Sequence, residues 1–187
     1  KRHGATSVEA FGDLGIVAPA LVNFLALLGW SYDGEREIFT LAELERAFTL
    51  ERVGATPAIF NVEKLEWMNG QHLRRLAAEE RARLAREFLA RRGVVVDAEF
   101  VERLVEVLGE RVRTLADLET QGAFALRDAL EVDPQAWAEL VAKEDVAGRL
   151  EALAADLAAL PEFTPAETER VTRALAAGRG IKPGELM

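Results

Sequence analysis

Apolar side chains recur along most of the chain at intervals of three and four residues, a spacing that places them on one face of an α-helix. The clearest stripes run through residues 101–108 and 146–160. Residues 18–28 are instead apolar on nearly every side, which predicts a central buried helix. No stretch alternates as a half-buried strand does, and the valines at 94–96 predict only a short extended link. The pattern therefore predicts a mainly α fold.

Capping residues mark where several of these helices begin. Thr6 and Thr40 each stand three residues before a glutamate, which is the capping-box spacing. Thr164 adds a proline at the first helical position, and Asp133 also precedes a proline. Gly15 is placed to end a helix in a left-handed conformation. These signals predict a succession of short helices joined by tight turns.

The composition of the chain changes near residue 76. Before this point the sequence is rich in aromatic residues, and after it alanine, leucine, arginine and glutamate dominate, as is typical of a helix bundle. A weaker change falls near residue 122. We therefore predict three regions, 1–76, 77–122 and 123–187, of which the last two are all-helical.

Composition also excludes several classes of site. Half of the 187 residues are hydrophobic, which is enough for a sizeable core. The chain has no cysteine, so disulfides and thiolate metal sites are excluded, and its two histidines, His3 and His72, lie far apart in sequence. No apolar run approaches the roughly 20 residues that cross a bilayer, and no signal peptide is recognisable. We expect a cytoplasmic protein with no membrane span and no metal site.

The formal net charge of −9 argues against a general nucleic-acid-binding protein, which would be basic. Positive charge is nevertheless concentrated in one stretch. Eight lysine and arginine residues lie between Lys64 and Arg92, against five acidic residues if Glu63 is included. This stretch is either a contact surface for a polyanion or an ordinary solvated helix face, and charge alone does not separate the two.

The segment 60–73 combines a helix start with polar side chains. Asn61 is placed to cap a helix, and Lys64, Asn69 and His72 could form a polar edge near its end. Such side chains suit contacts to sugar and phosphate. The alternative is a core helix that ends in a simple turn at residues 69–70.

Two further groups of basic residues could hold a phosphate or read a base. Lys1 could bind phosphate as a mobile positive charge, and Arg2 could bind it through two parallel hydrogen bonds. Alternatively, both could be ordinary charged residues. Arg111 and Arg113 could read an unpaired base or could simply oppose the dipole of the preceding helix. The sequence contains no Ser/His/Asp arrangement, no Walker loop and no GxGxxG motif, so no catalytic set is predicted.

Taken together, these segments resemble bacterial glutamyl-tRNA synthetase, a class I synthetase. Lys1–Arg2 is similar to the end of that family's KMSKR-type loop, and residues 3–8 and 18–30 are similar to the segment that follows the loop. Residues 37–41 and 60–73 match two further blocks at the expected spacing. The similarity is dense over the first predicted region and looser, but colinear, over the other two.

The resemblance implies a division of labour. The catalytic Rossmann domain and the glutamate pocket would lie upstream of Lys1, so the chain is expected to be a C-terminal portion of a glutamate–tRNA ligase, cut at both ends and inactive alone. Region 1–76 would contact the tRNA stem, and the remainder would form two anticodon-binding subdomains. The partner would be tRNAGlu, ATP with magnesium and L-glutamate would bind through the upstream half, and a monomer is expected.

The resemblance also implies roles for single residues. Lys1 matches the family lysine that steadies the ATP phosphates, and Arg111 matches the arginine that reads the third anticodon base. The basic stretch that begins at Lys64 is our hypothesis for the tRNA track. The residues expected to contact tRNA are Lys64, Asn69, His72, Arg74, Arg75 and Arg111. Two alternatives stay open: a stand-alone helical module that binds RNA or protein, derived from a synthetase, and a purely structural helix bundle.

Overall fold

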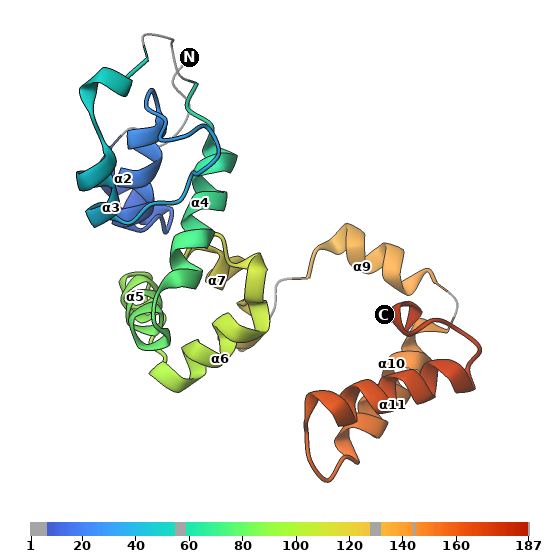
Figure 1. The fold of residues 1–187 in the computed structure, drawn as a ribbon. Coiled ribbons are helices and arrows are strands. Elements are labelled where there is room, and N and C mark those ends of the chain that lie inside the picture. The colour runs from blue at the N-terminus through green and yellow to red at the C-terminus, as the bar shows by residue number, and fades with distance from the viewer. Residues whose placement is uncertain (1–6, 55–58, 128–131, 144, 187) are drawn as a thin grey trace. The chain divides into compact units, whose positions relative to one another are not determined.

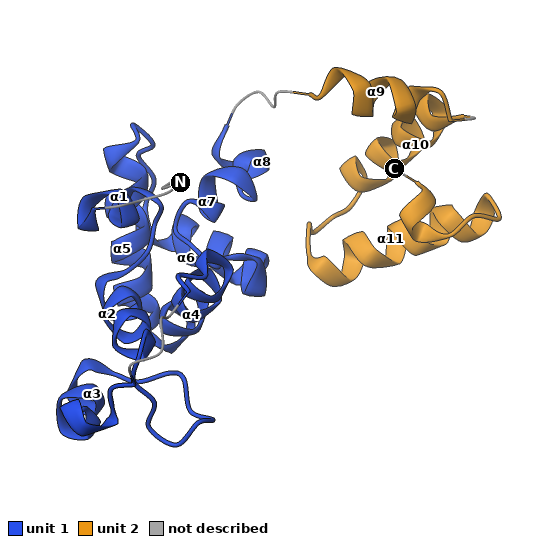
Figure 2. Cartoon of the chain, turned by 90° about the horizontal axis from the view of Figure 1, so that it is seen from above, with its two compact units in different colours: residues 1–130 blue, residues 131–187 orange. Residues whose placement is uncertain are grey.

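A computed structural model of the chain describes residues 7–54, 59–127, 132–143 and 145–186 (Figure 1). Throughout these ranges the regular secondary structure is helical, and the only β pairing is an isolated antiparallel bridge between Trp30 and Val53. The mainly α fold is therefore confirmed. The chain forms two compact units, residues 1–130 and 131–187, shown in blue and orange in Figure 2.

The first unit contains eight α-helices and two short 3-10 turns within its described part. The helices are α1 (Val8–Asp13), α2 (Ala18–Leu27), α3 (Leu41–Ala47), α4 (Val62–Arg75), α5 (Ala78–Arg91), α6 (Ala98–Leu108), α7 (Asp117–Thr120) and α8 (Ala123–Leu126). The 3-10 turns are η1 (Leu50–Arg52) and η2 (Gly109–Arg111). Helix α2 packs against α3 and α4, and α5 packs against α6 (Figure 1).

One hydrophobic core runs through most of the first unit and crosses residue 76. Leu65 and Met68 on α4 belong to the same buried cluster as Phe88 and Leu89 on α5. The predicted stripe on α6 is confirmed, because its four apolar residues, of which Val101 is the first, are all buried. Regions 1–76 and 77–122 thus share one core, and their separation in function stays a prediction.

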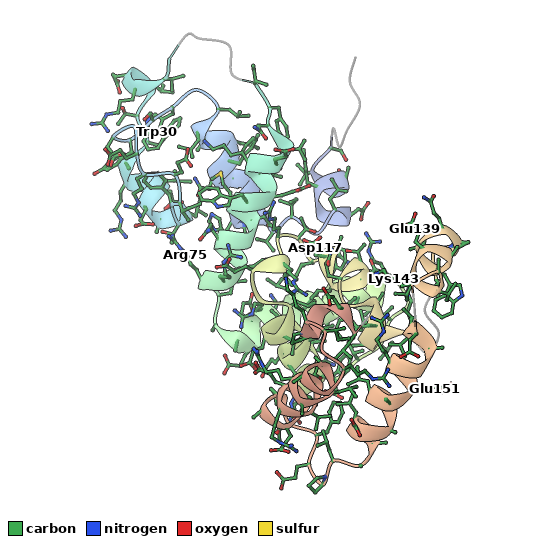
Figure 3. All side chains as sticks on the ribbon, turned by 90° about the vertical axis from the view of Figure 1, so that its right-hand side faces the viewer. Trp30, Arg75, Asp117, Glu139, Lys143 and Glu151 are labelled. Atoms are coloured by element: carbon green, nitrogen blue, oxygen red, sulfur yellow. The ribbon has the colours of Figure 1, made fainter. Side chains whose placement is uncertain are left out.

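A smaller core lies beside α3. Trp30, Phe39 and Leu44 are buried together, and the rings of Trp30 and Phe39 meet edge to face with centroids 5.8 Å apart. Figure 3 marks Trp30 within this cluster. Some of the aromatic residues of the first predicted region therefore form a second, local core.

Most of the predicted caps are confirmed. The Thr40 hydroxyl accepts from the Glu43 N–H, and the Glu43 carboxylate accepts from the Thr40 N–H, which completes a capping box. Asp133 and Thr164 cap α9 and α11. Helix α1 is capped by Ser7, which accepts from Ala10 N–H at 3.2 Å, whereas Thr6 lies outside the described residues.

The prediction of a central buried helix at residues 18–28 holds for one face of the helix only. Helix α2 buries one face, which includes Asn23 and Phe24, but Val22 and Leu25 are 43 % and 48 % exposed. Helices α3 and α4 pack on α2. Apolar composition all round therefore did not predict burial all round.

The second unit consists, within its described residues, of α9 (Pro134–Val141), α10 (Val146–Ala158), α11 (Pro165–Gly178) and the 3-10 turn η3 (Pro183–Glu185). Helix α11 packs against α10 and η3. Of the predicted stripe on α10, Val146 is buried and the leucines are half-buried. Leu186 is fully buried and closes this small core.

Candidate nucleic-acid interface

Helix α4 carries five of the residues that the sequence predicted to contact tRNA. Its start is fixed by Asn61, whose Oδ1 accepts from the Lys64 N–H at 3.0 Å, as predicted. Its last turn contains His72, Arg74 and Arg75. Positive charge in the last turn of a helix is stabilised by the partial negative charge of the unpaired carbonyl groups there. The helix therefore places two arginines at its exposed C-terminal end.

Asn69 joins three segments of the first unit. Its Oδ1 accepts from the Val17 N–H at 2.8 Å, and its Nδ2 donates to the carbonyl oxygens of Gly15 at 3.2 Å and Arg113 at 2.6 Å. The side chain is completely buried. Because a buried amide without partners is costly, three bonds at one residue hold the α1–α2 loop and the η2–α7 loop against α4.

Close backbone contact reinforces this junction. The Leu115 N–H donates to the Gly15 carbonyl at 3.0 Å. Gly15 has a φ of +79°, and a Cβ at this position would lie 2.5 Å from the Leu115 nitrogen. Only glycine fits here, for both conformational and steric reasons. The predicted left-handed turn after α1 is thus also the point where two distant loops meet.

His72 is also buried, next to Asn23 of α2. The Asn23 Oδ1 accepts from the Phe39 N–H at 2.9 Å and lies 3.0 Å from the His72 Nε2. Since the Phe39 N–H fixes the oxygen of Asn23 on this side, Nε2 of His72 must carry the proton and donate. Burial lowers the pKa of His72, and the nearby charge of Arg75 lowers it further. The imidazole is therefore held neutral.

Lys64, Asn69 and His72 do not form the polar edge that the sequence suggested. Lys64 is paired with Glu37 at the half-exposed side of α4, while Asn69 and His72 point into the core. The contacts of Asn69 and His72 favour a positioning role for both. Direct contact of these three residues with tRNA stays a prediction.

Four arginines lie at the end of α4, on α5, and in or directly after η2. We call them the α4–η2 arginines: Arg74, Arg81, Arg111 and Arg113. Arg74 and Arg81 line a cleft of about 200 Å³ with η2 residues and an apolar floor that includes Val105 and Val112. A Cβ on Gly70 would lie 3.2 Å from Arg74 Nη1 and 3.3 Å from Arg113 Cα, so the Arg74 guanidinium passes beside the η2–α7 loop.

Among the described residues, no carboxylate lies within 4.0 Å of any α4–η2 arginine or of Arg75, which Figure 3 marks near the end of α4. Glu106 and Glu110 line the same cleft beyond ion-pair distance. Arg83 differs, because it pairs with Glu80 at 2.7 Å and with Glu87 at 2.6 Å.

These hydrogen bonds raise the pKa of Arg83 and neutralise its charge locally. The basic stretch that the sequence suggested as one track therefore contains both compensated and uncompensated charges. The uncompensated charges, at the end of α4, around η2 and at Arg86 and Arg91 on α5, are the ones available to an external anion.

Asp117 is a residue of the candidate site that sequence reasoning missed. Its Oδ2 accepts from the N–H groups of Arg113 at 2.9 Å and Thr114 at 2.7 Å, and Figure 3 marks it at α7. The carboxylate thus fixes the backbone immediately after Arg111. An acidic residue in the first turn of a helix was the available signal, but it did not reveal which loop the side chain would hold.

Lys1 lies outside the described residues. In the described part of the chain, no group of three or more histidine, aspartate or glutamate side chains could hold a metal ion. Within the same ranges, no helix has the length and apolar character needed to cross a membrane.

Comparison with known families identifies the region. Residues 80–187 match the family of anticodon binding domains, and residues 1–67 match the catalytic domain family of class I tRNA synthetases for glutamate and glutamine. The chain therefore belongs to the anticodon binding domain family and corresponds to the C-terminal region of class I glutamyl-tRNA synthetases.

Individual relatives of the chain agree with these family matches. The glutamate–tRNA ligase of Thermodesulfovibrio yellowstonii is 39 % identical over 191 residues, and that of Syntrophobacter fumaroxidans is 40 % identical over 187 residues. Each match covers 100 % of this chain, which spans about two fifths of these curated relatives (41 % and 40 %). The crystal structure of a glutamate–tRNA ligase from Elizabethkingia meningosepticum matches 95 % of this chain and 35 % of its own, with a TM-score of 0.77 and 25 % identity.

Proposed function

We propose that the chain is the tRNA-binding portion of a glutamate–tRNA ligase, an enzyme that activates L-glutamate with ATP and transfers it to tRNAGlu. The observation that supports this most strongly is the group of uncompensated arginines around η2, in a chain whose net charge is −9. Selective binding is favoured when positive charge is limited to the surface that contacts the tRNA. Phosphate contacts on the rest of the protein surface would add affinity for any RNA.

Within this proposal the residues have different tasks. Arg74 and Arg75 contact backbone phosphates, since exposed guanidinium groups make forked bonds to phosphate oxygens. Arg111 reads the third anticodon base from the end of η2. Asn69 and Asp117 hold the η2–α7 loop in place, and His72 supports α4 from the core.

The residues before α1 would serve the catalytic half of the ligase. The match of residues 1–67 to a catalytic domain family supports a position next to the active site. Lys1 would steady the phosphates of ATP, which binds with magnesium, and the chain alone would catalyse nothing. A cytoplasmic location and a monomeric state are part of the same proposal.

Binding of a tRNAGlu transcript to the 187-residue chain tests the proposal. The double variant Arg74→Gln/Arg75→Gln should bind roughly tenfold more weakly at low salt, and its slope of log K against log salt should be shallower by about two. Arg83→Gln is the matched control, because Glu80 and Glu87 already neutralise that arginine. An unmodified chain that fails to bind tRNAGlu, or an equal loss in the control, would refute the proposed track.

A further inference from the structure

A second cleft in the first unit lies beside α3 and shares no lining residue with the cleft near η2. Its volume is about 450 Å³. Three arginines from three different segments line it, together with aromatic and hydroxyl groups. The lining residues are Tyr32, Arg36, Phe39, Glu43, Arg46, Ala47, Thr49 and Arg52.

Glu43 is the only carboxylate among these lining residues, and its oxygens already have partners within the protein. It accepts from the Thr40 N–H at 2.8 Å and the Thr40 hydroxyl at 2.9 Å, and it pairs with Arg36. These bonds, led by the backbone N–H, lower its pKa to about 2, so it stays ionised. Glu43 therefore balances Arg36 and leaves the other two arginines uncompensated.

Arg46 and Arg52 have no carboxylate within 4.0 Å among the described residues. Arg52 is nevertheless held in place, because its Nη1 donates to the Tyr32 carbonyl at 3.0 Å and its guanidinium lies 5.7 Å from the centre of the Tyr32 ring. An arginine whose position is fixed and whose charge has no carboxylate partner can bind an anion without first being reordered.

The walls of the cleft are supported from behind. The buried cluster of Trp30, Phe39 and Leu44 backs the cleft. The Gly54 N–H donates to the Gly29 carbonyl at 2.7 Å, next to the bridge between Trp30 and Val53, so the segment after η1 is tied to the segment after α2.

We propose that this α3–η1 cleft binds a phosphate of the RNA backbone, with Arg46 and Arg52 as its ligands. The inference rests on the proposed tRNA-binding function, and it assigns the expected stem contact of region 1–76 to particular residues that the sequence did not single out. Guanidinium groups match the geometry of phosphate oxygens. The cleft is larger than a single phosphate, and the exposed side of Tyr32 and the Thr49 hydroxyl leave room for the adjoining sugar.

The test compares tRNAGlu binding by Arg46→Gln, Arg52→Gln and the double variant, with circular dichroism to confirm the fold. Removing both charges should weaken binding roughly tenfold and reduce the slope against log salt by about one. Arg46→Gln carries particular weight, because the side chain of Arg46 makes no hydrogen bond or ion pair with another described residue, so the substitution acts through charge.

Arg103→Gln is the matched control, since Arg103 is exposed and pairs with Glu99 at 2.8 Å. If the cleft variants bind as tightly as the unmodified chain while Arg74→Gln/Arg75→Gln is weakened, the cleft is not an RNA contact and the proposed function stands. If the unmodified chain does not bind tRNAGlu at all, both proposals fall.

A second measurement separates RNA from free phosphate. Inorganic phosphate is titrated at constant ionic strength while the side-chain Nε–H signals of Arg46 and Arg52 are followed by NMR. We expect only weak, unsaturated shifts, because a lone phosphate would occupy part of the cleft. Saturation by inorganic phosphate, together with unchanged tRNA affinity in the double variant, would assign the cleft to free phosphate and overturn the proposal.

Discussion

The Nδ2 of Asn69 donates to the carbonyl oxygen of Arg113 at 2.6 Å, across 44 residues of sequence. This bond connects the middle of α4 to the loop that begins beside Arg111. The same amide also binds the loop between α1 and α2. The placement of the candidate base-reading arginine therefore depends on a side chain that is itself completely buried.

Replacing Asn69 by alanine should destabilise the first unit by about 2–4 kcal/mol, because buried N–H and C=O groups lose their partner. Hydrogen exchange checks this locally: the Val17 amide should exchange much faster, since its N–H has lost its acceptor. Gln71→Ala on the same helix is the control, because the Gln71 side chain is only half-buried and makes no hydrogen bond to another described residue. Equal protection of Val17 in both variants would contradict the role given to Asn69.

Gly15→Ala should cost about 3–4 kcal/mol in the free energy of unfolding, from a left-handed backbone and from a clash with the Leu115 nitrogen. Gly34→Ala isolates the first effect, since Gly34 has a φ of +88° and open space around its Cβ position. That variant should lose only about 1–2 kcal/mol. Urea unfolding of the two proteins measures the difference, and similar losses would show that the contact with Leu115 carries no cost.

Arg111→Gln should weaken discrimination between the tRNAGlu anticodon and one that differs at the third base, by roughly 1–3 kcal/mol for the loss of one base contact. The fold should not change, because Arg111 is exposed and forms no ion pair within the described residues. Arg111→Lys keeps the charge but loses the fork, so it should keep overall affinity and lose most of the discrimination. Unchanged discrimination in both variants would remove Arg111 from anticodon reading.

Lowering the pH should destabilise the first unit through His72. Its pKa in the folded chain lies below the ordinary value of 6.5, so the unfolded chain binds more protons as the pH falls through 6.5. This contribution is fully present above about pH 6.5 and is lost progressively as the pH falls toward the folded pKa. The urea concentration at the midpoint of unfolding should therefore decrease as the pH is lowered from about 7.5 to about 5.5. The midpoint of His72→Asn should change less over this range, and an equal change in both proteins would show that another group is responsible.

The sequence predicted what is encoded locally. The capping box at Thr40 and the buried stripe that begins at Val101 follow from residues three and four apart, and both are present. The partners of Asn69 and Asp117 could not be predicted in this way, because each holds a loop whose position is set by the packing of several helices. Asn23 gave a partial signal as a lone amide inside an apolar run, but its contact with His72 depends on α2 lying against α4.

The candidate site shows the same limit. Composition indicated a basic stretch, but it could not separate Arg83, balanced by two glutamates, from Arg74, which has no carboxylate nearby. It also overlooked Arg46 and Arg52, because the charges that meet in the α3–η1 cleft are scattered along the sequence. Net charge along a segment therefore does not show which individual charges are paired and which are uncompensated.

The shared core has a practical consequence for dividing this protein. The two family matches end at residue 67 and begin at residue 80, which invites a cut between them. Such a cut would part Leu65 from Phe88 and would leave each half with an apolar surface open to water. It would also sever the link from Gly15 to Arg113 that passes through Asn69. An engineer who wishes to exchange this region between related proteins would do better to transplant the first unit whole.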